Sequence, residues 1–125
     1  MSKKILNIGI MSRADYQQRT IAIAKGEYRP APDEPKVWFE SLKSMAQVLS
    51  DENQALLDLI ICHKPGSLAE LEQISQRKKP NLSRTLKTLE RYGVVELHKE
   101  SGKLIPVVRA TDFRVQFGLS HGWVA

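Results

Sequence analysis

The sequence has few of the residues that build covalent scaffolds or membrane spans. Cys62 is the single cysteine among 125 residues, which excludes a disulfide framework and favours a reducing, cytoplasmic setting. No apolar run approaches the roughly 18 residues that a membrane-spanning helix needs. The apolar stretch behind the N-terminus stops at Met11 without a cleavage site, so no signal peptide is expected. Apolar residues still make up 42% of the chain, enough to close a hydrophobic core.

Residues that carry catalytic or metal chemistry are equally sparse. The three histidines follow no recurrent metal-binding spacing, and the seven glycines form no phosphate-binding loop. Cys62 and His63 are adjacent, and adjacent side chains of a helix diverge by about 100°, so we expect Cys62 to be a buried small hydrophobe. Ser12, Ser50 and Ser67 are better explained as helix caps than as nucleophiles. The sequence therefore predicts no enzyme, no metal site and no cofactor.

The basic residues are unevenly distributed. The formal net charge of the chain is +5. Residues 77–91 contain six basic residues and one acidic residue, so this block holds as much net positive charge as the whole chain. The preceding block, residues 51–76, contains five acidic residues and one basic residue. Residues 77–91 are therefore either a solvated helix face or a binding surface for a polyanion.

The N-terminal third predicts a strand followed by a helix. Residues 5–11 are rich in isoleucine and predict a short strand. Residues 13–25 predict a helix that Ser12 caps and Gly26 ends. Three prolines within six residues then break the chain into an extended connector. We therefore divide the chain into a strand-helix extension at residues 1–33, for oligomerisation or partner binding, and a second domain at residues 34–125.

The second domain predicts a series of helices followed by a hairpin. Apolar spacing and serine caps predict helices that end near Leu49, begin at Asp51 and begin after Ser67. Residues 77–80 are expected to form a turn, and Asn81 is expected to cap a further helix, which Gly93 ends. Two strands follow with a charged tip at residues 99–103 between them, and alternating apolar residues near Phe117 suggest another strand. The predicted fold is mainly α with a small β hairpin, a winged helix-turn-helix with an N-terminal strand-helix extension.

The helix expected at residues 81–92 separates leucines from hydrogen-bond donors. Leu82, Leu86 and Leu89 form its apolar stripe, and the basic side chains point away from that stripe. Arginine can bond a guanine edge, and the helix N-terminus favours phosphate. We therefore expect this helix to read the major groove and the wing at residues 96–105 to touch the DNA backbone. The candidate DNA-binding residues are Lys78, Lys79, Asn81, Ser83, Arg84, Lys87, Thr88, Arg91, Lys99 and Lys103.

Two stretches of the second domain resemble a known family. Residues 63–71 (HKPGSLAEL) and 81–95 (NLSRTLKTLERYGVV) are similar to small prokaryotic transcriptional regulators with a MarR-like winged helix. The resemblance covers about residues 37–111, and residues 19–27 also look like that family. Unlike larger MarR proteins, this sequence has no long flanking dimer helices. The residues that match the family's recognition helix are Asn81, Ser83, Arg84 and Lys87.

These observations lead to three hypotheses. The first is a sequence-specific double-stranded DNA-binding transcriptional regulator, a repressor or autoregulator that acts as a homodimer. The second is an antitoxin-type interaction module, because some relatives in the resembled family look like antitoxins. Residues 1–33 would then neutralise a toxin, and their strand would add to a partner's sheet edge or to its own twin. RNA binding is the third, since RNA shares the charge requirement but offers no groove for a helix.

Overall fold

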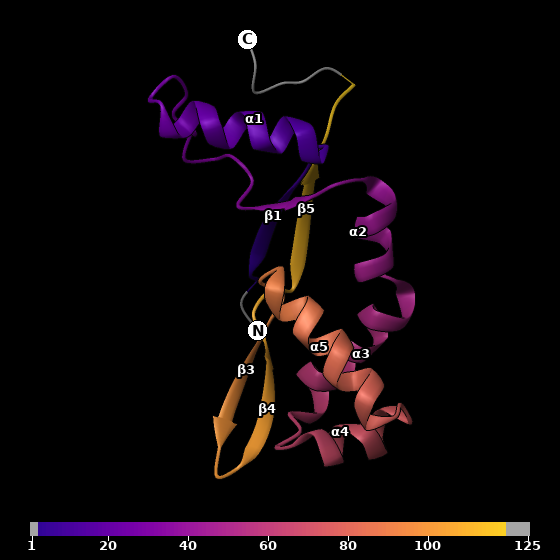
Figure 1. The fold of residues 1–125 in the computed structure, drawn as a ribbon. Helices are drawn as coiled ribbons and strands as arrows, with labels where there is room; N and C mark the ends of the chain where they lie inside the picture. Colours follow the sequence, from indigo (N-terminus) through magenta and orange to yellow (C-terminus); the bar gives the residue numbers. More distant parts are fainter. Residues whose placement is uncertain (1–2, 120–125) are drawn as a thin grey trace.

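Helices and two small sheets alternate along residues 3–119, the part of the chain that the computed structural model describes (Figure 1). The elements are β1 (Ile5–Ile10), α1 (Arg13–Ala24), β2 (Val37–Phe39), α2 (Leu42–Val48), α3 (Asp51–His63), α4 (Leu68–Ser75), α5 (Lys79–Arg91), β3 (Val95–Glu100), β4 (Lys103–Val108) and β5 (Asp112–Gln116). The expected helices and hairpin are present. The described chain is nevertheless mixed α/β and not mainly α, because it also contains a second sheet.

That second sheet joins strands that are far apart in the sequence. β1 is the middle strand, and β2 and β5 pair with it in parallel on either side. Ile8 of β1 is fully buried and lies opposite Val37 of β2 and Val115 of β5. The expected division at residues 33/34 therefore runs through one hydrogen-bonded sheet. At Ile8 and Gly9 both edges of β1 are paired within the chain, so this part of the strand is closed to a partner's sheet.

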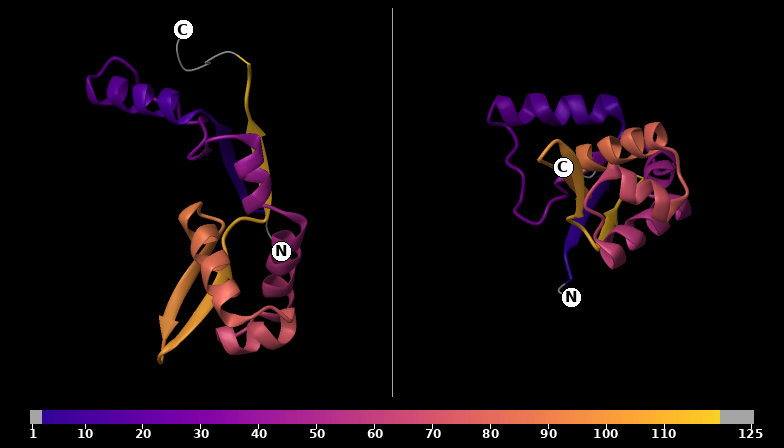
Figure 2. Two further views of the ribbon diagram at one scale, coloured as in Figure 1. Left: turned by 45° about the vertical axis from the view of Figure 1, so that its right-hand side comes forward. Right: turned by 90° about the horizontal axis from the view of Figure 1, so that it is seen from below.

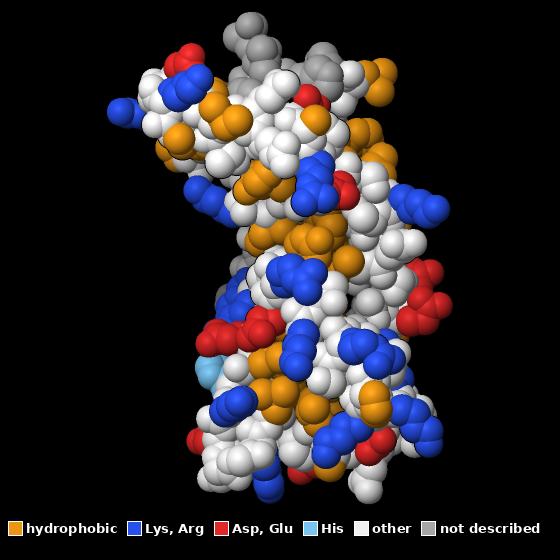
Figure 3. All heavy atoms as spheres, in the orientation of Figure 1, with side chains coloured by type: hydrophobic (Ala, Val, Ile, Leu, Met, Phe, Trp, Pro, Cys, Tyr) orange, Lys and Arg blue, Asp and Glu red, His pale blue; other side chains and the backbone are white. Residues whose placement is uncertain are grey.

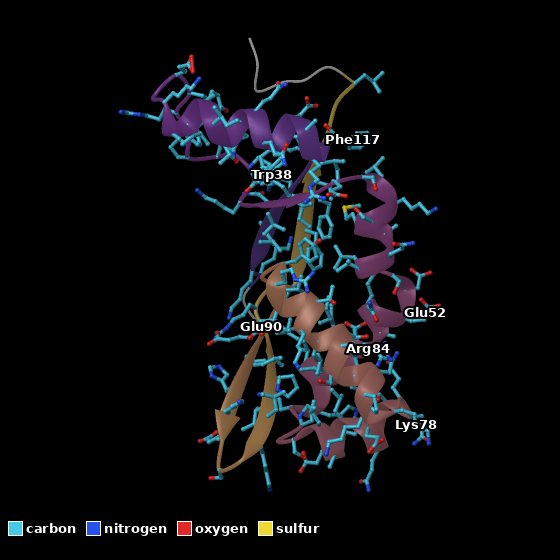
Figure 4. All side chains as sticks on the ribbon, in the orientation of Figure 1. Trp38, Glu52, Lys78, Arg84, Glu90 and Phe117 are labelled. Atoms are coloured by element: carbon cyan, nitrogen blue, oxygen red, sulfur yellow. The ribbon has the colours of Figure 1, made fainter. Side chains whose placement is uncertain are left out.

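A tryptophan links this sheet to α1. Trp38 lies opposite Gly9, and a Cβ atom on Gly9 would be 2.3 Å from Trp38 Cζ3, so the indole rests directly on the glycine backbone. Arg19 of α1 is buried and lies over the indole, with Cζ 5.0 Å from the ring centroid. Its guanidinium is 3.4 Å from the carboxylate of Glu34. Figure 4 shows Trp38 beneath α1, and in Figure 2 α1 projects beyond the sheet.

The serine caps are confirmed. The side-chain oxygens of Ser12, Ser50 and Ser67 each accept a hydrogen bond from the backbone N–H three residues later, at the starts of α1, α3 and α4. The cap of α4 includes a second hydrogen bond. The carboxylate of Glu70 accepts the backbone N–H of Gly66 at 2.6 Å, one residue before the cap. Local polar chemistry thus fixes where three of the helices begin.

The start of α5 was predicted wrongly. α5 begins at Lys79, with Lys78 as the N-cap residue, and Asn81 is inside the first turn. Pro80 occupies the second position of the helix, where its missing N–H leaves no hydrogen bond unmade. Glu72 of α4 accepts the backbone N–H of Lys79 at 3.1 Å, which supplies the cap that Lys78 lacks. The stretch expected as a turn is therefore partly helical.

A leucine-rich core holds the half of the molecule that contains α3, α4, α5 and the β3–β4 hairpin (Figure 1). Leu82, Leu86 and Leu89 of α5 are fully buried, as predicted. They pack with Leu56, Leu57 and Ile60 of α3, Leu68 and Leu71 of α4, and Val94 and Val95 at the start of the hairpin. Because the apolar stripe of α5 is completely covered, the opposite face of this helix is fixed toward solvent.

The hairpin has a shorter tip than expected. Its turn consists of Ser101 and Gly102, with φ angles of 52° and 74°, values typical of a two-residue hairpin turn. Lys99 and Lys103, expected in the tip, belong to β3 and β4.

The longest helices of residues 3–119 have 13 residues, and none has the length and apolar character needed to cross a membrane.

Candidate nucleic-acid interface

The outward face of α5 carries three exposed cations. Arg84, Lys87 and Arg91 are exposed, and within residues 3–119 none of them forms an ion pair or a side-chain hydrogen bond. Figure 3 shows Lys and Arg side chains spread across the α5 side of the molecule, and Figure 4 places Arg84 on this helix. The buried leucines therefore hold a helix whose cationic groups remain available to a ligand.

Two lysines extend this surface to the N-terminus of α5. Lys78 and Lys79 are exposed, at the N-cap and the first helical position. The helix dipole is positive at the same end, where the carboxylate of Glu72 of α4 already accepts the backbone N–H of Lys79. Glu52 of α3 lines a surface pocket together with Arg77, Lys78 and Asn81, so acidic groups of both neighbouring helices border this end of the surface; Figure 4 labels Glu52 and Lys78. The positive surface thus begins at the α4–α5 connection.

Asn81 is held by a residue that was not among the candidates. The guanidinium of Arg77 donates from Nε to Asn81 Oδ1 at 2.8 Å, from Nη1 to Asn53 Oδ1 at 3.2 Å, and from Nη2 to Thr85 Oγ1 at 3.2 Å. Arg77 is half-buried and connects α3 to the first turns of α5. No sequence pattern indicates this role, because the three acceptors come from residues that are 4, 8 and 24 positions away.

The expected row of donors is interrupted at Thr88. Its hydroxyl donates to the backbone carbonyl of Arg84 at 3.1 Å, so the hydroxyl proton is used inside α5. Thr88 and Ser83 are both half-buried, in contrast to the exposed cations. The outward face of α5 consequently relies on Arg84, Lys87, Arg91 and the amide of Asn81.

The structure does not bring the two hairpin lysines together. Lys99 lies opposite Leu104, and Lys103 lies opposite Glu100. Since neighbouring residues of a strand point to opposite faces, these two pairs lie on opposite faces of the ribbon. Lys99 shares its face with Leu97, which packs against the core. Only Lys99 is thus on the side of the hairpin that faces the helices.

The other face of the hairpin is partly acidic. Glu96 forms an ion pair with Arg109, and its carboxylate is 3.3 Å from His98 Nε2. Glu100 lies directly opposite Lys103 on this face. A separate carboxylate, that of Glu90 in α5, accepts the backbone N–H of Leu97 and ties the helix to β3. Lys103 thus has the acidic Glu100 as its cross-strand neighbour, whereas Lys99 has the apolar Leu104.

Metal-ligating side chains are not gathered anywhere in residues 3–119, where no group of three or more His, Cys, Asp and Glu could hold an ion.

Cys62 is exposed on α3, which contradicts the expectation of a buried cysteine. The reason is its position on the helix. The buried residues Leu56, Leu57 and Ile60 define the inner face of α3, and Cys62 lies off that face.

Comparison with known families identifies the chain. The sequence model of the HVO_A0114 family matches residues 48–115, more than half of the chain. The chain belongs to the HVO_A0114 family. The matched segment runs from the end of α2 into β5 and contains every candidate DNA-binding residue. No curated protein and no solved structure matches the chain.

Proposed function

We propose that the chain is a sequence-specific double-stranded DNA-binding transcriptional regulator, a repressor or autoregulator that presents α5 to the major groove. The observation that carries this proposal is the exposed cationic face of α5 above a completely buried leucine stripe. Arg84, Lys87 and Arg91 have no acidic partner within the described residues. A polyanion would supply the missing counter-charge.

The order of elements supports a winged helix-turn-helix of the MarR-like kind. α3 is followed by the short helices α4 and α5 and then by the β3–β4 hairpin. α5 would be the recognition helix, with its first turn on base edges, and the hairpin would be the wing. The hydrogen bond from Leu97 N–H to Glu90 fixes the wing against that helix. Lys99 would touch the DNA backbone, and Lys103 would contribute less.

The chemistry of the face fits duplex DNA. The major groove is about 12 Å wide and admits one helix, with phosphates along both sides. Arg84 in the second turn can donate two parallel hydrogen bonds to guanine. Lys78 and Lys79 at the helix start and Arg91 at its end would meet phosphates on opposite sides. Duplex RNA is a weaker match, because its deep and narrow major groove does not admit side chains in the same way.

Binding to duplexes selected from a random DNA pool tests the proposal. The logarithm of the association constant should fall with the logarithm of salt concentration, at about −0.9 per phosphate neutralised. Arg84→Ala should weaken specific binding by about 1–3 kcal/mol with an unchanged circular dichroism spectrum. Arg91→Gln should make the slope of this salt dependence shallower by about 1, the value for one phosphate contact. Lys43→Gln, which removes the same charge from α2, should leave the slope unchanged. Salt-independent binding, or equal competition by duplex RNA, would contradict the proposal.

A homodimer is part of the same proposal. One module of this size makes few base contacts, and a two-fold pair on a palindrome doubles them, with half-sites about 34 Å apart. Exposed apolar side chains lie on β5 and beyond it, at the end of the molecule away from α4, where Figure 4 shows Phe117. Val115 is 37% exposed and Phe117 60% exposed. Light scattering of the free protein and of its DNA complex measures the stoichiometry.

A second candidate function, toxin neutralisation, is favoured by the surface of α1. Tyr16 and Ile21 are exposed on this projecting helix, at 42% and 54%. A partner would contact α1 rather than β1, which is the middle strand of its sheet. Deleting residues 1–33 would remove the middle strand of a sheet, so a surface substitution is the sharper test. Ile21→Lys should abolish partner binding while DNA binding is retained; retained partner binding would exclude α1.

A further inference from the structure

The hydrogen bonds of Arg77 determine which way the amide of Asn81 faces. Arginine carries only donors, so the atom of Asn81 that lies 2.8 Å from Arg77 Nε must be the carbonyl oxygen Oδ1. The second acceptor, Asn53, is fixed independently, because its Nδ2 donates to the carbonyl of Val48 at 2.9 Å. Arg77 therefore holds the carbonyl of Asn81 toward the body of the protein. Asn81 is exposed, and its Nδ2 group, a pure donor, has no hydrogen-bond partner within residues 3–119.

This orientation bears on base reading at the start of α5. A free asparagine recognises adenine with both halves of its amide: Oδ1 accepts from N6–H and Nδ2 donates to N7. In Asn81 the accepting half points at the guanidinium of Arg77. The remaining N–H groups can only donate, and guanine offers two acceptors, N7 and O6, at the same edge.

The charge of Arg77 acts in the same direction. Its three side-chain acceptors are two amides and a hydroxyl, all neutral, so no carboxylate is hydrogen-bonded to the guanidinium. A cationic nitrogen therefore lies 2.8 Å from the amide oxygen of Asn81. A positive potential favours base atoms that accept hydrogen bonds and disfavours the amino groups of adenine and cytosine.

We propose that Arg77 is a positioning residue that holds the Asn81 amide as a fixed donor, so that the first turn of α5 selects guanine over adenine. Asn81 makes the base contact, and Arg77 does not touch the DNA. The inference rests on the proposed function, because it requires α5 in the major groove. It adds a base preference at one position of the operator to that function.

Selection of bound duplexes from a random DNA pool tests the inference with three proteins. The wild type should select guanine at one position, and Asn81→Ala should lose that preference while the other positions keep theirs. Its affinity for the guanine-containing duplex should fall about threefold to tenfold, the effect of one lost hydrogen bond. Arg77→Met keeps the side-chain length but has no donors, so the freed amide should shift the preference at that position toward adenine.

A fourth protein keeps the test decisive if Arg77→Met does not fold. In Asn81→Asp the carboxylate can still accept from Arg77, and an acidic group in the first turn suits the helix dipole, so the fold should be retained. This variant lacks the N–H donors, and its affinity ratio between the guanine and adenine duplexes should fall toward one. A merely structural link would leave that ratio unchanged.

The outcomes separate this inference from the proposed function. Selection of adenine at the position that Asn81→Ala relaxes overturns the inference alone, as does an unchanged preference in both Arg77→Met and Asn81→Asp. Failure of the wild type to enrich any duplex overturns the inference and the proposed function together.

Discussion

Replacing Gly9 by alanine places a methyl group inside the indole of Trp38. The new Cβ would be 2.3, 2.5 and 2.9 Å from three ring atoms, whereas ordinary contacts begin at 3.4 Å. The ring would have to retreat by about 1 Å, but Trp38 is held in β2, which is paired to β1, and Arg19 packs over the ring. Overpacking of this kind lowers the free energy of unfolding by about 1–3 kcal/mol, whereas replacing a glycine within a strand by alanine raises it by roughly 0.5–1 kcal/mol. The net loss of unfolding free energy should be about 1–2 kcal/mol.

Urea unfolding followed by far-ultraviolet circular dichroism measures this loss. Gly66→Ala is the matched control, because its Cβ would lie 3.6 Å from the nearest atom, an oxygen of Glu70, and should change stability by less than about 0.5 kcal/mol. A double-mutant cycle isolates the clash: in a Trp38→Ala background, Gly9→Ala should no longer destabilise. An undiminished effect in that background, or a Gly9→Ala protein as stable as the wild type, would refute the proposed clash.

Three further predictions concern stability. Leu86→Ala should cost about 2–5 kcal/mol by urea unfolding, because Leu86 is fully buried, whereas Leu42→Ala at a 43%-exposed site should cost little; equal costs would be inconsistent with the core. Ser67→Ala should cost about 1 kcal/mol in thermal unfolding by removing the cap of α4, and no loss would discount the cap. The hydrogen bond to Glu34 raises the pKa of the Tyr28 hydroxyl above its ordinary value of 10.0. That bond therefore stabilises the fold below pH 10.0 and less as the pH rises beyond it, so the stability difference between wild type and Tyr28→Phe should shrink above that pH. A difference that stays constant would contradict this assignment.

Features that depend on neighbouring residues could be predicted from the sequence. The caps at Ser12, Ser50 and Ser67 follow from one side chain and an N–H three residues away. The buried stripe of α5 follows from leucine spacing alone, since the helix period fixes which side chains share a face. Gly93 has a φ angle of 78°, as expected for the residue that ends α5. In each case the deciding physics is local.

Features that depend on distant pairing could not be predicted. The parallel pairs of β1 with β2 and β5 join residues up to 107 positions apart, and no local periodicity encodes such a choice. The earlier start of α5 depends on Glu72 of the preceding helix, which caps Lys79. The opposite orientations of Lys99 and Lys103 depend on the length of the turn between their strands. These contacts are decided by tertiary geometry.

The candidate surface is intermediate between these cases. The exposed positions of Arg84, Lys87 and Arg91 follow from the helical period, and the sequence predicts them. The engagement of Asn81 by Arg77 does not, because it requires α3 and the α4–α5 connection to be side by side. The positive surface was therefore predictable from the sequence, but the orientation of its groups was not.

A map of amide shifts upon DNA binding tests most directly whether α5 is the reading helix. The measurement is a ¹⁵N–¹H spectrum of the labelled protein, recorded before and after addition of a duplex selected from the random pool. The largest changes should lie at residues 78–91, with smaller ones near Lys99 and none along α1. Changes concentrated on α1 or β5, with residues 78–91 unmoved, would contradict the assignment of α5 as the DNA-reading element.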